Sequence, residues 1–252
     1  MPNKQAQQWS TTEQFWAELH EVIFDEARIR RGEREAAELT QLVGLDSPAR
    51  ILDVCCGPGR HAIPLAARGH HVTGIDSTER YVEIARERAA DAGVEAVFVH
   101  TDARGYSSTP RVDVVLNLWS SFGHFADPED NVAVLRQAHA SLHDGGTFVL
   151  HLRSRETYNA RQTPERSWAE HKGALYLEER YVADDWRRVR GRWVVVDSSG
   201  RRDFPYESWL YSGEELTAML RTVGFRDISL HGDFSGAPYG QFSKHLVVVA
   251  HR

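Results

Sequence analysis

The apolar positions along the chain change their spacing, from a helical repeat near the N-terminus to short runs typical of buried strands. Phe15, Leu19 and Ile23 recur at helical spacing within residues 12–24. A second helical stretch covers residues 31–43 and leads directly into an apolar run. The pattern therefore predicts an N-terminal helical segment ahead of the first strand.

Strand and helix patterns then alternate over about 100 residues, as expected for α/β units. In chain order, they are a strand at 50–54, a helix at 61–67, strands at 71–76 and 96–100 around a helix at 79–92, a strand at 112–117, a helix at 129–142, a turn at 144–146 and a strand at 147–152. Alternation of this kind predicts a parallel sheet with crossover helices.

Beyond residue 152 the chain changes character. Segments rich in Val, Tyr and Trp at 175–183, 187–197 and 201–211 predict an antiparallel insertion. A helix at 212–223 and closing strands at 225–232 and 245–251 then return to the α/β pattern.

The predicted fold is a Rossmann-like, doubly wound, mostly parallel seven-stranded sheet with an antiparallel β insertion and an N-terminal helical cap. The predicted division of the chain is a cap at residues 1–45, an α/β domain at 46–152 and 212–252, and the insertion at 153–211.

Composition narrows the classes of function. The formal net charge of -6 offers no global attraction to nucleic acid, so a nucleic-acid partner is not favoured. The two cysteines, Cys55 and Cys56, are adjacent, which favours neither a disulfide framework nor a metal site and suits a reducing cytoplasm. No apolar run approaches the ~20 residues of a spanning helix, so no membrane association is expected.

The most informative segment runs from Ile51 to His61, where a buried strand enters a glycine-containing turn and then a helix. Glycines at such a turn allow a ligand close to the backbone and its N–H groups. Asp76 ends the next strand, where a carboxylate can accept both hydroxyls of a ribose. Gly57 and Gly59 alone would fit an ordinary tight turn, but the strand, the helix and the acid together predict a nucleoside cofactor.

The order of these motifs resembles the class I S-adenosylmethionine-dependent methyltransferases. The matching segments are the loop at 53–59, Asp76, Asp102 with Ala103, residues 113–118 and residues 142–146. The resemblance implies S-adenosylmethionine as cofactor and S-adenosylhomocysteine as product. One departure is Cys55, which stands where the family usually has glycine.

The resemblance also implies a set of cofactor-binding residues. They are Asp53, Cys55, Gly57, Gly59, Asp76, Ser77, Asp102, Ala103, Asn117 and Leu118. Asp53 and the amides near Gly57 are expected at the methionine end, Asp76 at the ribose, Asp102 at the adenine amino group, and Asn117 with Leu118 beside the sulfonium. A simple turn-forming role is the alternative for Asp102.

The loop after the fourth strand of the alternating pattern supplies candidates for acceptor chemistry. His124 can act as a general base near neutral pH, or simply hydrogen-bond a neighbouring loop. Trp119 and Phe122 can line an acceptor pocket or belong to the core. In the insertion, Arg153, Tyr181 and Tyr211 are candidate acceptor contacts, with an ion pair or a second hydrophobic layer as the alternatives.

The sequence therefore predicts methyl transfer to nitrogen or oxygen of a small-molecule acceptor, with an amine slightly favoured. The cap and the insertion are expected to close over the site, and a homo-oligomer is compatible with such an insertion. The alternatives are an RNA or protein methyltransferase, of which the acidic charge disfavours RNA, and a non-catalytic S-adenosylmethionine-binding partner protein.

Overall fold

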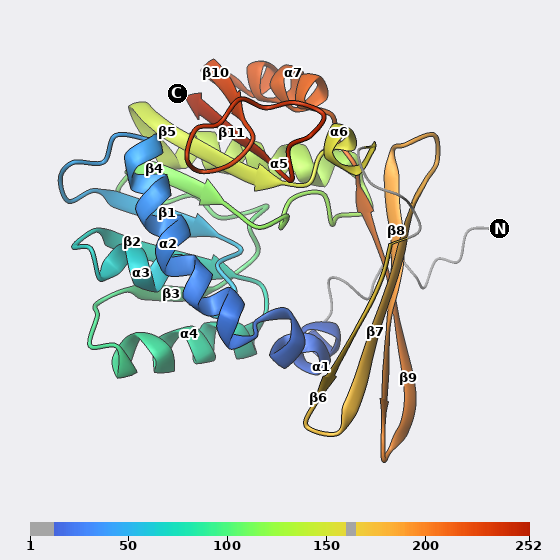
Figure 1. Cartoon of the computed structure of the whole chain (residues 1–252). Coiled ribbons are helices and arrows are strands. Elements are labelled where there is room, and N and C mark those ends of the chain that lie inside the picture. The colour runs from blue at the N-terminus through green and yellow to red at the C-terminus, as the bar shows by residue number, and fades with distance from the viewer. Residues whose placement is uncertain (1–12, 160–164) are drawn as a thin grey trace.

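A seven-stranded sheet forms the centre of the molecule. The computed structural model describes residues 13–159 and 165–252 (Figure 1). The strands of this sheet are β1 (Arg50–Val54), β2 (His71–Asp76), β3 (Val97–His100), β4 (Val112–Asn117), β5 (Leu142–Leu152), β10 (Arg226–His231) and β11 (Leu246–His251). Their order is β10-β11-β5-β4-β1-β2-β3, and only the pairings of β11 are antiparallel. This confirms the predicted doubly wound, mostly parallel sheet.

Helices cover both faces of the sheet because both faces are apolar. The helices of this part are α2 (Glu26–Leu42), α3 (Ala62–Ala66), α4 (Glu79–Asp91), α5 (Pro128–Ser141) and α7 (Gly213–Val223). On one face, Leu39, Leu65 and Val82 of α2, α3 and α4 join a buried cluster. On the other, Leu135 and Leu216 of α5 and α7 join a second cluster.

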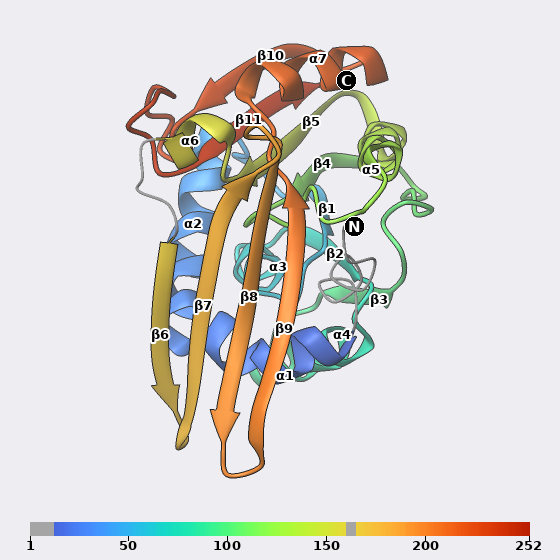
Figure 2. The same ribbon diagram turned by 90° about the vertical axis from the view of Figure 1, so that its right-hand side faces the viewer.

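A second, four-stranded antiparallel sheet stands beside the first. Its strands are β6 (Glu165–His171), β7 (Ala174–Ala183), β8 (Arg188–Asp197) and β9 (Gly200–Trp209), in that order. Figure 2 shows this sheet in front of the body, with α1 (Glu13–Ile23) behind its lower part. Phe15 and Leu19 of α1 pack with Val195 and Phe204 on its inner face. The predicted β insertion is therefore present as a separate layer.

Several predicted element boundaries were wrong. Helix α2 begins at Glu26 rather than Arg31, because the Asp25 side chain caps it by accepting from the N–H of Arg28 at 2.8 Å. The expected turn at 144–146 lies inside β5, with Gly145 at a φ of 82° and a register shift in the pairing with β4. Strand β6 and the short helix α6 (Arg155–Asn159) were not predicted, and the first residues of the predicted 12–24 helix and of the 1–45 cap lie outside the described residues.

Two kinds of feature are absent from the described residues. No helix in residues 13–159 or 165–252 is long and apolar enough to cross a membrane. Over the same two ranges, no three His, Cys, Asp or Glu side chains are grouped so that they could hold a metal ion.

Candidate cofactor and acceptor site

The glycine loop after β1 takes a left-handed backbone at alternate residues. The φ angles are 59° at Cys55, 53° at Gly57 and 77° at Gly59. A Cβ on Gly59 would lie 2.9 Å from Cδ1 of Ile63, so the loop can turn into α3 only with glycine there. Cys55 adopts this conformation with a side chain, and its Sγ lies 4.0 Å from Nδ2 of Asn117 at the end of β4. The departure at Cys55 is therefore accommodated, and the loop keeps its predicted course.

Asp76 at the end of β2 ties the glycine loop to the neighbouring strand. Its Oδ2 accepts from the N–H of Gly57 and its Oδ1 from the N–H of Thr78, both at 2.9 Å. Burial raises the pKa of Asp76, while these two N–H groups favour its ionised form. Each carboxylate oxygen keeps further lone-pair capacity, so Asp76 can still accept from ligand hydroxyls.

Two buried oxygen acceptors near the loop have no hydrogen-bond partner among the described residues. They are Oδ2 of Asp53 in β1 and Oδ1 of Asn117 in β4, whose residues are 2% and 1% exposed. Burial, reinforced by the charge of Asp76, raises the pKa of Asp53 to about 7. An unsatisfied buried polar atom costs roughly 1–3 kcal/mol, so these oxygens suit a ligand that donates hydrogen bonds.

Arg60, which directly follows the glycine loop, carries a hydrogen-bond donor without a partner among the described residues. Its Nε donates to the carbonyl of Arg28 at 2.8 Å and its Nη2 pairs with Glu35 of α2, while Nη1 is buried without a partner among the described residues. The guanidinium stacks on Trp119, 4.6 Å from the ring centroid. The unpaired acceptors of Asp53 and Asn117 suit an ammonium group, and the unpaired N–H of Arg60 suits a carboxylate. An amino-acid group, such as the methionine end of the cofactor, carries both.

Sequence reasoning missed Arg60 and Glu35. His61 shares the Glu35 carboxylate, with its Nε2 2.9 Å from Oε2. The network holds α2 against the loop, and Gly32 makes this approach possible because a Cβ there would meet the Arg60 carbonyl. The only signal in the sequence is that Arg60 directly follows Gly59.

Aromatic side chains from separate elements cover the loop. This aromatic roof consists of Trp16, His20, Phe24, Tyr81 and Trp119. The Phe24 ring is 5.4 Å from that of Trp119 and 5.2 Å from that of Tyr81. A Cβ on Gly57 would lie 3.1 Å from Cζ of Phe24, so the roof lies directly on the loop. Phe24, which directly follows α1, therefore packs against the glycine loop.

His124 lies under the same roof. Its ring packs edge-on against Trp16 at 6.5 Å. Its Nε2 is 3.0 Å from the carbonyl of Ser120, which can only accept, so Nε2 carries the proton and Nδ1 keeps its lone pair. Nδ1 is buried without a partner among the described residues, and burial lowers the pKa of His124. The predicted hydrogen bond to a neighbouring loop is therefore present, and Nδ1 is the ring nitrogen left to accept, while the general-base role stays a prediction.

The predicted cofactor-binding residues Asp102, Ala103 and Ser77 differ in burial and in their partners. Asp102 pairs with Arg104 at 2.5 Å, and Arg104 also reaches Asp130 at 2.8 Å. Ala103 is buried, while Ser77 is exposed and accepts from Nε2 of His100 through its carbonyl at 3.0 Å. Any ligand contact of the Asp102 carboxylate must therefore coexist with this ion pair.

The predicted acceptor contacts separate into two groups. Phe122 and Tyr211 pack together at 5.5 Å, and Leu118 is buried nearby in the chain beside Asn117. Arg153 is engaged by Glu165 at 3.0 Å and stacks on Tyr158. Tyr181 is 47% exposed and alternates with inner-face residues of β7, so it lies on the outer face of the second sheet. The structure does not bring Tyr181 together with the others.

The sheet order, the glycine loop after β1 and the acid that ends β2 define a nucleoside-binding α/β domain of the methyltransferase type. Residues 51–146 match the model of a methyltransferase domain. The chain therefore contains a methyltransferase domain at residues 51–146, and its sheet has the fold of S-adenosylmethionine-dependent methyltransferases.

Similar curated proteins match a half to three quarters of the chain. The dTDP-3-amino-3,6-dideoxy-alpha-D-glucopyranose N,N-dimethyltransferase of Streptomyces fradiae is 35% identical over 53% of this chain and 51% of that protein. The glycine/sarcosine N-methyltransferase of Aphanothece halophytica is 27% identical over 73% of this chain and 69% of that protein. The chain thus spans about half the length of the first of these relatives.

Among solved structures, the CcbJ methyltransferase from Streptomyces caelestis has the same fold. It superposes with a TM-score of 0.75 at 24% identity, covering 87% of this chain and 88% of that one. CalS10, an amino pentose methyltransferase from Micromonospora echinaspora solved with S-adenosylmethionine bound, gives a TM-score of 0.63 at 21% identity, covering 90% and 93%.

Proposed function

We propose that the protein transfers the methyl group of S-adenosylmethionine to a nitrogen or oxygen atom of a small-molecule acceptor, with an amine favoured. The observation that carries this proposal is the neutral His124, whose free Nδ1 lies under the aromatic roof near the glycine loop. An amine arrives protonated near neutral pH and must lose its proton before it can attack. Similar N- and O-methyltransferases support the choice of acceptor atoms.

The bound cofactor supplies an activated methyl group on its sulfonium, so the protein chiefly aligns the reactants. In this proposal Asp53 and Asn117 accept from the cofactor's ammonium, Nη1 of Arg60 donates to its carboxylate, and Asp76 accepts from the ribose. The aromatic roof excludes water, and the face of an aromatic ring attracts a neighbouring cation. His124 receives the proton that leaves the acceptor.

The insertion supports an acceptor cap in this proposal. The end of β9 contacts the loop that follows β4, because the N–H of Trp209 donates to the carbonyl of Gly123 at 2.7 Å. Phe122 and Tyr211 line its junction with the main sheet. The division into cap, core and insertion at residues 45, 152 and 211 and the cytoplasmic location stay predictions, and the two free thiols favour a reducing compartment.

Transfer of an isotopically labelled methyl group tests the proposal. The purified chain is incubated with labelled S-adenosylmethionine and a panel of amino sugars, amino acids and phenols, and S-adenosylhomocysteine is quantified with and without each compound. Acceptor-dependent release, with the label on nitrogen or oxygen, is expected for at least one small molecule. Label transfer only to RNA or protein would contradict the proposal, and cofactor binding without transfer to any acceptor would favour a non-catalytic partner protein.

A further inference from the structure

The loop that follows β4 begins with two consecutive residues in the left-handed region of backbone conformation. The φ angles are 61° at Trp119 and 63° at Ser120, and neither residue is glycine. A residue with a side chain pays free energy to adopt this conformation, so such a turn persists only where surrounding contacts hold it. The contacts that hold this turn therefore need to be identified.

His151, near the carboxyl end of β5, supplies the acceptors for both backbone N–H groups of the turn. Its Nδ1 accepts from the N–H of Trp119 at 3.1 Å, and its carbonyl accepts from the N–H of Ser120 at 2.9 Å. The register of the main sheet explains this contact, because Asn117 lies opposite Leu150 where β4 and β5 pair side by side (Figure 1). A single residue of β5 thus holds both positions of the turn.

The ring of His151 is a buried, neutral acceptor. The residue is 5% exposed, and its ring centroid lies 4.8 Å from those of Phe234 and His245. Burial, reinforced by His245, His61 and Arg60, holds the pKa of His151 well below its usual value. Because Nδ1 accepts from a backbone N–H, the neutral ring carries its proton on Nε2. The bond to the turn is therefore available throughout the neutral pH range.

The turn in turn holds His124. The carbonyl of Ser120 lies 3.0 Å from Nε2 of His124, and since a carbonyl only accepts, the proton of that ring is fixed on Nε2. The direction of a carbonyl follows from the backbone dihedral angles around it. A turn that leaves the left-handed region therefore no longer directs this carbonyl at His124, and the tautomer with Nδ1 free to accept loses its support.

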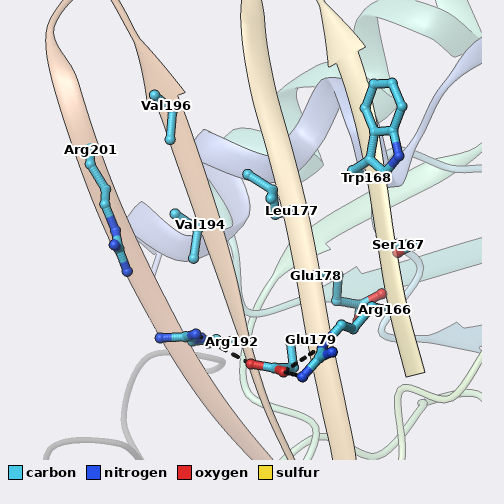
Figure 3. Close-up of a pocket in the computed structure, with 10 residues that line it drawn as sticks. All are labelled: Arg166, Ser167, Trp168, Leu177, Glu178, Glu179, Arg192, Val194, Val196 and Arg201. Carbon is cyan, nitrogen blue, oxygen red and sulfur yellow. Dashed lines mark hydrogen bonds and ion pairs between the residues drawn. The ribbon is translucent and has the colours of Figure 1, made fainter. Parts of the chain in front are cut away.

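A hollow elsewhere on the molecule is separate from this turn. Figure 3 shows a groove of about 600 Å³ on the second sheet, with Trp168, Leu177 and Val194 along it and an ion pair of Glu179 with Arg192 at its border. The described residues that line it all belong to β6, β7, β8 or β9. The groove therefore contributes no residue to the support of His124.

We propose that His151 is a positioning residue, which sets the tautomer and orientation of His124 through the turn formed by Trp119 and Ser120. The N–H of Arg153 donates to Oγ of Ser120 at 3.1 Å and holds that side chain, whereas His151 holds the backbone. This inference rests on the proposed function, because a fixed tautomer affects the rate only if His124 receives the proton of the acceptor. The hydrogen bonds themselves do not depend on that function.

Proton–nitrogen correlation NMR spectra of the isotopically labelled chain show which ring nitrogen of a histidine carries the proton. Two variants of His151 are compared with the wild type. His151→Phe keeps a ring but removes the acceptor, and the proton of His124 is expected to distribute over both nitrogens. His151→Asn places an amide oxygen where Nδ1 lies, and the wild-type tautomer of His124 is expected to return. The signals of His124 are identified by their loss in His124→Ala.

The rate provides a second readout. His151→Phe is expected to lower kcat about 10-fold, because a misdirected base loses part of the ~100-fold that general-base catalysis contributes. The same change in a His124→Ala background is expected to lower kcat no further, since a residue that acts through another has no effect once that other is removed. His151→Asn is expected to stay within about threefold of the wild type.

His70 provides the matched control. It is also buried, at 6% exposed, and its Nδ1 also accepts from a backbone N–H, that of Ala49 at 3.2 Å. Both residues precede strands, β2 and β1, so this bond lies at the amino ends of the strands. His70→Phe is expected to lower the melting temperature, as His151→Phe does, but to leave the tautomer of His124 and kcat unchanged.

Two results would overturn the proposal. They are an unchanged tautomer of His124 in folded His151→Phe, and an equal loss of kcat on adding His151→Phe to the wild type and to His124→Ala. A changed tautomer in a chain that methylates no acceptor would support the positioning role and contradict the proposed function instead. His151→Leu removes the same acceptor with a smaller side chain and takes the place of His151→Phe if that variant does not fold.

Discussion

Asp76→Ala is expected to weaken the binding of S-adenosylmethionine by roughly 1–3 kcal/mol, or about 5- to 150-fold in Kd. The carboxylate is buried at the end of β2 and anchors the N–H of Gly57, so its loss removes the expected ribose acceptor and loosens the glycine loop at once. Hydrogen bonds to a charged acceptor are about twice as strong as neutral ones, which sets this magnitude.

Isothermal titration calorimetry measures this effect. Asp113→Ala is the matched control, because Asp113 is the second residue of β4, near the amino end of that strand, and pairs with His143 at 2.7 Å. Its replacement is expected to leave cofactor affinity within about twofold of the wild type. Equal affinities for Asp76→Ala and the wild type, with both proteins folded, would remove Asp76 from the site.

His124→Ala is expected to lower kcat by ~100-fold or more while cofactor affinity stays unchanged, because general-base catalysis contributes that much to proton removal. Burial holds the pKa of His124 below 6.5, so the ring is neutral at pH 7. As the pH falls through this lowered pKa, the ring gains a proton and can no longer accept one. The wild-type rate is therefore expected to fall as the pH drops through this lowered pKa, and the variant is expected to lack this acidic limb.

His143→Ala provides the control for His124. His143 is a partly exposed histidine near the amino end of β5, paired with Asp113, and its replacement is expected to leave the rate and its pH profile unchanged. A near-wild-type kcat for His124→Ala would show that alignment alone carries the reaction and that the acceptor arrives deprotonated.

The main sheet could be predicted because its signals are local. Continuous apolar runs such as Val112–Asn117 need burial on both faces, and the alternation of strand and helix leaves few topologies. Strand β6 escaped detection because Glu165–His171 carries Trp168 and Ala169 as its only apolar side chains and lies at the edge of the second sheet. Its hydrogen bonds to β7 stabilise the extended conformation that its own sequence does not predict.

The candidate site could be predicted where motif and chain position coincide, as at Asp53, Gly57, Asp76 and Asn117. Arg60 could not be predicted from the sequence, because its role depends on the unpaired Nη1. This atom is left without a partner only because Glu35, Arg28 and Trp119 contact the rest of the guanidinium in the folded chain. Tyr181 is a residue whose type suggested an acceptor contact that its position does not support. The alternation of side chains along β7 places it on the outer face of the second sheet. The face on which a strand residue lies is set by the packing of the sheet and not by residue type.

A calorimetric titration of the wild-type chain with S-adenosylmethionine and, separately, with S-adenosylhomocysteine tests the central claim most directly. The orphan acceptors at Asp53 and Asn117, the orphan donor at Arg60 and the carboxylate of Asp76 predict that both compounds bind at one site per chain, since they share the amino-acid and ribose groups. Absence of binding by both compounds, in a protein shown to be folded, would contradict the assignment of this site to S-adenosylmethionine.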